Sequence, residues 1–124
     1  MSTLNVSNIT DGTTTVGTSY VVNGSAKAWV NFNGQGTIAI RESLNVSSLT
    51  DRGTGQYTVN FSSAFADANY SAVGMVRGSD GTDASMENMG LSNPTAPTSS
   101  GAAIAVGYNG TFYDCPTVNL VVHR

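Results

Sequence analysis

The sequence predicts an all-β protein, either a small antiparallel β-sandwich or a jelly-roll-like head domain, preceded by an extended N-terminal segment. Apolar and polar residues alternate, as at Tyr57, Val59 and Phe61, which is the pattern of a half-buried strand. Gly paired with Asn or Asp, typical of tight turns, separates such runs. Apolar residues nowhere recur at helical spacing over about ten positions, so we expect no helix beyond a turn at residues 63–69.

Residues 1–25 are predicted to be an extended lead-in. They are rich in Thr, Ser and Gly, and Leu4, Val6 and Ile9 are too sparse to form a core. A lone strand leaves its backbone donors unpaired and does not offset its conformational entropy. We therefore expect neighbouring chains to order this segment, which would make it an oligomerisation segment.

Residues 26–124 are predicted to form the head domain. The expected strands lie at residues 26–33, 37–48, 56–62, 70–77, 84–91, 102–108 and 117–123. The expected turns are Asn33-Gly34, Asp51-Arg52-Gly53, Asp80-Gly81 and Asn109-Gly110. The segment from Ser92 to Gly101 contains two of the three prolines, which a central strand excludes, so we expect a long exposed loop there.

Four large aromatic residues are the expected structural core: Trp29, Phe32, Tyr57 and Phe61. Trp29 and Phe32 fall on opposite faces of one predicted strand, because successive side chains alternate between faces. If both are buried, one faces the sandwich core and the other faces a boundary between subunits.

The composition fits a single domain that functions outside cells. The chain has 124 residues, enough for one core. Charged residues make up 10%, against roughly 25% in typical soluble domains. A surface of hydroxyls and amides resists proteases that cut at Lys and Arg, and part of the apolar surface is expected to be buried between chains.

Charge and segment patterns exclude several classes of protein. The net charge is −3 and the five basic residues are scattered, so we expect no nucleic-acid binding. No run approaches the roughly eighteen apolar residues of a membrane helix, and the N-terminus lacks a secretory signal, so we expect neither membrane insertion nor Sec export. The single cysteine, Cys115, excludes an intrachain disulfide and is expected to be a small buried hydrophobe.

The sequence offers no catalytic constellation, so we expect a protein that is not an enzyme and has no cofactor and no metal site. The single histidine, His123, lies in the last predicted strand, and no Gly-x-Ser-x-Gly motif occurs. Most carboxylates fall in turns, where Asp bonds its own backbone. A glycosidase pair stays open, because carboxylate separation is a spatial quantity. Residues 79–83 faintly resemble a calcium loop but lack the full pattern, and in a three-fold oligomer His123 could form a metal site on the axis.

The candidate binding residues are in loops, because loops carry function on rigid β scaffolds. The loops are Gly78–Asp83, Asn93–Gly101 and Tyr108–Asp114. The candidate receptor-binding residues are Asp80, Asp83, Tyr108, Asn109, Phe112, Tyr113 and Asp114. Aromatic rings beside Asn and Asp side chains suit carbohydrate, whose apolar faces stack while its hydroxyls form hydrogen bonds. The alternative is that these rings fill the core.

The run VVNGSAKAWVNFNGQGTIAIRESLNVSSLTDRGTGQYTVNFSSAFADANYSAVG closely resembles a module at the C-terminal ends of tail fibre and related receptor-binding proteins of tailed bacteriophages, many of them marine. The resemblance covers roughly residues 13–77. Its specific elements are Ala26 to Trp29, the turn at Asn31 to Gly34, Leu44 to Ser48, and Asp51 to Phe61. Such proteins diverge beyond residue 78, as a host-recognition surface would.

This resemblance implies a virion structural protein of a phage tail or fibre, extracellular after release, whose distal domain attaches to a receptor on the host cell surface. It also implies a homotrimer that contacts other virion fibre or tail proteins, with no catalytic residues to transfer. In such a trimer the lead-in would wrap the adjacent subunits. The competing class is a capsid decoration or head-fibre protein with a structural role only. A carbohydrate-processing tailspike fragment is a third class, against which the short chain and the missing acid pair both speak.

Overall fold

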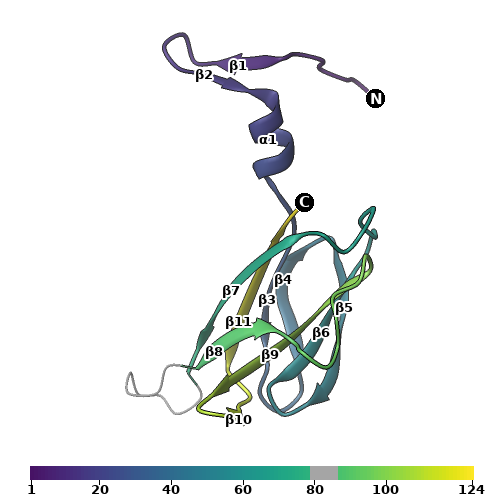
Figure 1. Ribbon diagram of the computed structural model, residues 1–124, viewed down its shortest axis with the longest axis vertical. Coiled ribbons are helices and arrows are strands. Elements are labelled where there is room, and N and C mark those ends of the chain that lie inside the picture. The colour runs from purple at the N-terminus through teal and green to yellow at the C-terminus, as the bar shows by residue number, and fades with distance from the viewer. Residues whose placement is uncertain (79–86) are drawn as a thin grey trace.

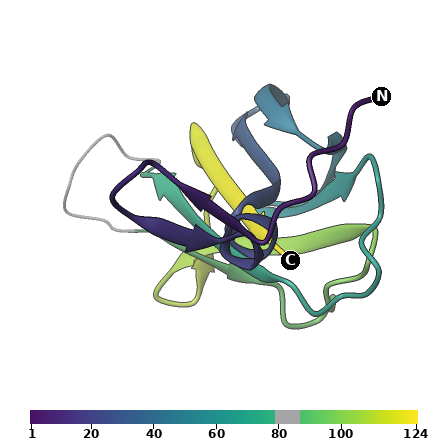
Figure 2. The same cartoon turned by 90° about the horizontal axis from the view of Figure 1, so that it is seen from above.

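The computed structural model describes residues 1–78 and 87–124. Two antiparallel sheets pack face to face, and a thin segment projects from one end of them (Figure 1). We call residues 1–25 the arm and the remaining described residues the head. In the view from above, the helix of the arm lies over the end of the sandwich (Figure 2). The predicted fold class, an all-β antiparallel sandwich, is confirmed.

The elements follow in this order. The arm contains β1 (Asn8–Thr10), β2 (Thr15–Gly17) and α1 (Thr18–Gly24). The head contains β3 (Ala26–Asn33), β4 (Ala39–Leu44), β5 (Val46–Gly53), β6 (Gln56–Phe61), β7 (Ser71–Arg77), β8 (Asn88–Leu91), β9 (Gly101–Tyr108), β10 (Thr111–Phe112) and β11 (Thr117–His123). One sheet has the order β4-β3-β11-β7. In the five-stranded sheet, β9 pairs with β6, β8 and β10, and β6 pairs with β5.

The core fills the space between the two sheets. Alternate residues of β3 and β11 face those of β6 and β9, as period-two alternation requires. Phe32 and Tyr57 are both fully buried in it, with the edge of one ring against the face of the other at a centroid distance of 5.1 Å. Phe61 is also buried and packs against Phe65 and Tyr70. Three of the four expected core aromatics are therefore in the core.

Trp29 is not in the core, which corrects the expectation for this residue. It is half-buried on the outer face of β3, while its neighbours Ala28 and Val30 face inward and are buried. Trp29 and Phe32 lie on opposite faces of β3, as predicted, and Trp29 faces outward because Phe32 faces the core. The sequence could not decide which of the two residues faced the core.

The predicted strand at 37–48 is in fact two strands, β4 and β5, separated at Asn45. Asn45 has a φ of 54°, a left-handed conformation that Asn tolerates better than most residues. Its Nδ2 donates to the carbonyls of Lys27 and Ser63, both at 3.2 Å, and its Oδ1 accepts from the Ser63 amide at 2.7 Å. The chain crosses from one sheet to the other at this corner. Alternation continued through both strands, so the break was not visible in the sequence.

The arm differs from the extended segment that was predicted. It begins without regular structure, forms the hairpin of β1 and β2, and ends in α1, which buries none of its residues. The only helix expected was a turn at residues 63–69, and that region contains none. Helix α1 has only seven residues and carries β-branched Val21 and Val22, so neither periodicity nor propensity marked it.

The turns follow the prediction in part. Asn109 and Gly110 have φ values of 49° and 80° and form the expected two-residue hairpin between β9 and β10. Asn33-Gly34 is not a two-residue hairpin, because β4 begins only at Ala39. The expected Asp80-Gly81 turn lies outside the described residues, and the described part of the expected strand at 84–91 contains β8.

Candidate functional site at the distal end of the head

The end of the head opposite the arm is formed by residues 34–38, the turn at 53–55, and residues 108–116 (Figure 1). We call it the distal end. Backbone hydrogen bonds join these three segments. The Gly34 amide donates to the Cys115 carbonyl at 2.9 Å, and the Val106 amide donates to the Gly55 carbonyl at 2.7 Å. Residues far apart in the sequence thus form one continuous surface.

Asp114 anchors the distal end from within. Its Oδ1 accepts from the Gly55 amide at 2.7 Å and lies 2.9 Å from the hydroxyl of the buried Tyr57. The same hydroxyl lies 2.8 Å from the Gly34 carbonyl. A phenol has one proton, so Tyr57 donates to one of the two acceptors at a time. Burial first, and the hydrogen bond to Asp114 second, raise the pKa of Tyr57.

Gly34 is required by this cluster. A Cβ at Gly34 would lie 2.6 Å from Tyr57 Oη and 2.9 Å from the Cys115 carbonyl oxygen, closer than real Cβ contacts. Asp114 is half-buried and holds this cluster together, so its described contacts are structural. Tyr113 is also half-buried, packs against the core, and donates its amide to the Val106 carbonyl. For Tyr113, therefore, the alternative interpretation holds: its ring packs against the core.

The hairpin of β9 and β10 forms the exposed tip of the distal end. Tyr108 is 47% exposed and Phe112 is 48% exposed, and Asn109 between them is exposed as well. Tyr108 pairs with Thr111, whereas Phe112 pairs with Gly107. Paired residues share a face and adjacent residues alternate, so the two rings lie on opposite faces of the hairpin.

This arrangement determines what the tip can bind. The two rings do not form a single platform, so a small ligand would contact one ring together with the Asn109 amide. An exposed ring beside an amide matches the apolar face and the hydroxyls of a sugar. Two exposed rings on opposite faces of a hairpin favour a shallow contact with an extended polymer over the enclosure of a small molecule.

The candidate loop Asn93–Gly101 is not at this tip. It runs along the five-stranded sheet from Thr95, which bonds Arg52, to the end of the head nearest the arm, where the Ser99 carbonyl accepts from the Phe65 amide and the Ser100 carbonyl accepts from the Phe61 amide, both at 2.8 Å. Asp80 and Asp83 lie outside the described residues. The structure therefore brings together Tyr108, Asn109, Phe112, Tyr113 and Asp114, and separates them from Asn93–Gly101.

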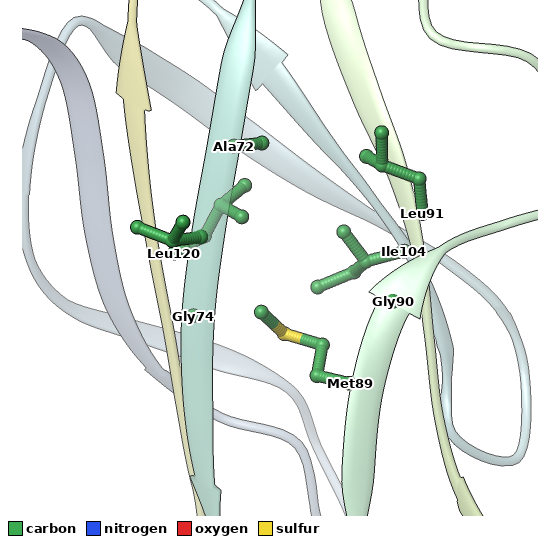
Figure 3. Close-up of a pocket in the computed structure, with 8 residues that line it drawn as sticks. Ala72, Gly74, Met89, Gly90, Leu91, Ile104 and Leu120 are labelled. Carbon is green, nitrogen blue, oxygen red and sulfur yellow. The ribbon is translucent and has the colours of Figure 1, made fainter.

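A pocket that the sequence did not reveal opens at one side of the sandwich, between β7 and β8 (Figure 3). Its volume is about 280 Å³ and its lining is apolar, with Ala72, Met89 and Leu91 around the opening and Ile104 and Leu120 deeper. The two strands belong to different sheets. No local sequence signal could have indicated the pocket, because it depends on how the sheets pack.

The predicted turn at Asp51-Arg52-Gly53 is wrong, because these residues belong to β5 and the turn follows at Thr54 and Gly55. From β5, Arg52 joins the loop after β8 to the five-stranded sheet. Its guanidinium donates to the carbonyls of Tyr57 at 3.2 Å and Ile104 at 3.1 Å, and to Thr95 Oγ1 at 3.0 Å. These bonds hold the segment 92–100 against the sheet. Arg52 therefore has a structural role.

The described residues contain neither a metal-binding cluster nor a membrane-spanning helix. Among residues 1–78 and 87–124, no three His, Cys, Asp or Glu side chains gather closely enough to hold a metal ion. In this part of the chain no helix has the length and apolar character that crossing a membrane requires. Cys115 is fully buried, and burial raises the pKa of its thiol to about 11. Such a thiol is protonated and unreactive at neutral pH.

The chain matches no protein-family model, no curated protein and no solved structure. The fold and the distal end described above, together with the sequence resemblance, are therefore the basis for a functional proposal.

Proposed function

We propose that this chain is a virion structural protein of a bacteriophage, the tail fibre or receptor-binding module that attaches the particle to the host cell surface. In this proposal the arm joins copies into a homotrimer and mounts them on other fibre or tail proteins. The distal end faces the host. Carbohydrate on the cell surface is the receptor chemistry that the tip fits best.

The observation that carries the proposal is that exposed apolar residues lie at both ends of the molecule, in addition to those on the sides of the head. At one end, Leu4, Tyr20, Val21 and Val22 of the arm are exposed, and α1 packs against no core of its own. At the other end, Tyr108 and Phe112 are exposed on the hairpin of β9 and β10, and Figure 1 shows β10 opposite the arm. Apolar residues that a chain leaves unburied commonly mark surfaces of interaction. A module that is mounted at one end and binds at the other has this distribution.

Attachment through such a tip would depend on several weak contacts. A ring stacked on a sugar contributes about 1 kcal/mol, which is roughly a fivefold change in affinity per site. Three tips that engage one surface multiply this factor, so the loss of one ring type from a trimer could weaken binding on the order of 100-fold. Small changes at the tip would therefore have large effects on adsorption.

The test compares adsorption of virions that carry variants of the full chain. Replacing both Tyr108 and Phe112 by Ala should reduce adsorption by at least about 100-fold, because both rings are half-exposed and their removal leaves the core intact. Asn93→Ala, an exposed change outside the distal end, is the matched control and should leave adsorption unchanged. If Asn93→Ala reduces adsorption and the hairpin variant does not, the binding site lies outside the hairpin.

The second candidate is a capsid decoration or head-fibre protein with a structural role only. The pocket between β7 and β8 favours this candidate, because it lies at the side of the sandwich and not at the distal end, where the first proposal places the receptor. Normal adsorption by virions that contain the double hairpin variant in normal amounts would contradict the receptor-binding proposal. A decoration protein should instead show its effect in capsid stability when the chain is absent.

A further inference from the structure

The outer face of the four-stranded sheet carries a continuous apolar row. The strand register aligns Trp29 of β3 with Leu44 of β4 on one side and Val121 of β11 on the other, and Val121 aligns with Val73 of β7. Directly opposed residues of antiparallel strands share a face. Trp29 lies on the outer face, so the whole row crosses the sheet there. We call this surface, with the next row of Glu42, Asn31, Asn119 and Met75, the Trp29 face.

The composition of this face is that of an interface core. Val73 is 58% exposed, Met75 is 76% exposed and Leu44 is 48% exposed, while Trp29 is half-buried at the centre. Aromatic and Met side chains are enriched, and charges depleted, at the centres of protein interfaces. Within these two rows the one charged residue is Glu42, at the β4 edge of the face.

The polar groups at the centre of the face are already paired within the chain. Asn31 Nδ2 donates to Asn119 Oδ1 at 2.5 Å, across the two central strands. Arg41 Nη1 donates to Asn31 Oδ1 at 3.3 Å, and its other nitrogen bonds the Pro116 carbonyl. Because these amides bond each other, removing water from the face leaves few unsatisfied groups. The face can therefore be buried at low cost.

We propose that the Trp29 face binds the Trp29 faces of two further copies of this chain, around a three-fold axis that runs along the strands. This inference takes the trimer from the proposed function. What it adds is a contact surface in the head. Leu44 at the β4 edge of one copy then lies next to Val73 at the β7 edge of the adjacent copy. Trp29 and Val121 of all three copies face the axis.

Strand spacing supports three copies. Four strands spaced by about 4.8 Å give a face about 19 Å wide. Three such faces make a triangular prism whose sides lie about 5.5 Å from its axis, close to half of the roughly 10 Å that separates packed sheets. Side chains of ordinary length therefore fill the space at the axis. Glu42 lies in the row that ends at Met75, and Arg77 lies in the next row along β7, so apolar contact and not charge pairing would join the meeting edges.

The area of the face shows that the arm must contribute as well. A face about 19 Å wide and seven residues long covers about 450 Å². Stable complexes bury about 800 Å² on each partner, so the face supplies roughly half. The arm leaves the head at Ala26, at the start of the strand that carries Trp29, so arms and faces would lie along one axis. Both contacts are required, and loss of either should dissociate the assembly.

The experiment measures the mass of the full chain by sedimentation and light scattering across a range of concentrations. Trp29 is the single tryptophan, so its fluorescence reports directly on the centre of the face. The wild type should form a particle of three 12.8 kDa chains, with Trp29 emission moving to shorter wavelength on assembly. Leu44→Glu with Val73→Glu should raise the concentration for half-dissociation at least tenfold and abolish the wavelength shift.

Two further variants separate the possible causes. Thr54→Glu places one negative charge on an exposed turn away from the face and should assemble as the wild type does. Tyr20→Ser with Val22→Ser weakens the arm and leaves the face intact. Circular dichroism of each variant verifies that the sandwich is folded, which is expected because the substituted side chains are outside the core.

Each outcome decides one point. If the face variant assembles like the wild type while the arm variant dissociates, the face is not an interface, and the proposed attachment function survives. A wild type that is monomeric at every concentration also overturns the inference. If the face variant dissociates but the hairpin variant of Tyr108 and Phe112 adsorbs normally, the inference stands and the receptor-binding proposal fails.

Discussion

Replacing Tyr57 by Phe tests how the distal end is held together. The substitution keeps the buried ring and its edge contact with Phe32, and removes only the hydroxyl. The hydroxyl lies 2.9 Å from the carboxylate of Asp114 and 2.8 Å from the Gly34 carbonyl. A hydrogen bond to a charged group contributes about 1.5–3 kcal/mol. In the variant, Asp114 still accepts from the Gly55 amide. Because Asp114 is half-buried, water replaces part of the hydrogen bond that it loses. We expect the free energy of unfolding to fall by about 2 kcal/mol.

The same substitution changes the pH dependence of stability. Burial and the bond to Asp114 raise the pKa of Tyr57 in the folded state above the value of about 10 in an unfolded chain. A group whose folded-state pKa is raised contributes stability that is complete below the unfolded-state pKa and is lost as the pH rises above it. Above about pH 10, this one residue should reduce the free energy of unfolding by about 1.4 kcal/mol per pH unit.

The assay is urea unfolding of wild type and Tyr57→Phe at pH 7 and between pH 10 and 11.5. Cys115, whose pKa is about 11, and Tyr70, whose pKa is raised by burial, add to the alkaline slope in both proteins. The variant should be less stable at pH 7 and should lose stability less steeply above pH 10. Equal stability at pH 7 together with equal alkaline slopes would refute the role assigned to the Tyr57 hydroxyl.

Three further substitutions or reactions test other features. Asn45→Ala should reduce the free energy of unfolding by about 2–4 kcal/mol, because it loses three hydrogen bonds and forces Ala into a left-handed conformation; Asn45→Gly, which tolerates that conformation, should lose less in the same urea titration, and equal losses would contradict the conformational part. Gly74→Ala should cost about 1–3 kcal/mol, because the added Cβ would overlap Met89 Cε and the backbone carbonyl of Asn119; an unchanged melting temperature would show that β7 shifts freely. Cys115 should react with a thiol reagent at pH 8 only as fast as the protein unfolds, because it is buried and protonated; labelling at the rate of the denatured chain would contradict this.

The fold could be predicted from the sequence where local patterns matched the final structure. Alternation identified β6 and β11, and Asn109-Gly110 identified a hairpin, because side-chain period and turn chemistry are local properties. Asn45 was missed for the opposite reason. Its turn is stabilised by Lys27 and Ser63, which are distant in the sequence, and Asn alone does not signal a change of sheet.

The candidate site could be predicted only in part. The exposure of Tyr108 and Phe112 follows from their position at a hairpin tip, which the sequence indicated. Asp114 was expected to be available to a receptor, but its contacts are with Tyr57 and Gly55. The distance between the segment 92–100 and the hairpin also required the structure, because the ends of the sandwich to which loops go depend on strand order. Trp29 required it too, since two aromatics on opposite faces give no sign of which one faces inward.

The two long sides of the sandwich are closed to different degrees. On one side the chain passes directly from β4 to β5 through Asn45, whose side chain bonds both neighbouring segments. On the other side β7 and β8 border a pocket and share no ladder of hydrogen bonds. Local fluctuations should therefore separate β7 from β8 more readily than β4 from β5, so the amides of β7 and β8 should exchange with solvent deuterium before those of β3 and β6. The side of the molecule that opens first would then be the side that carries the pocket.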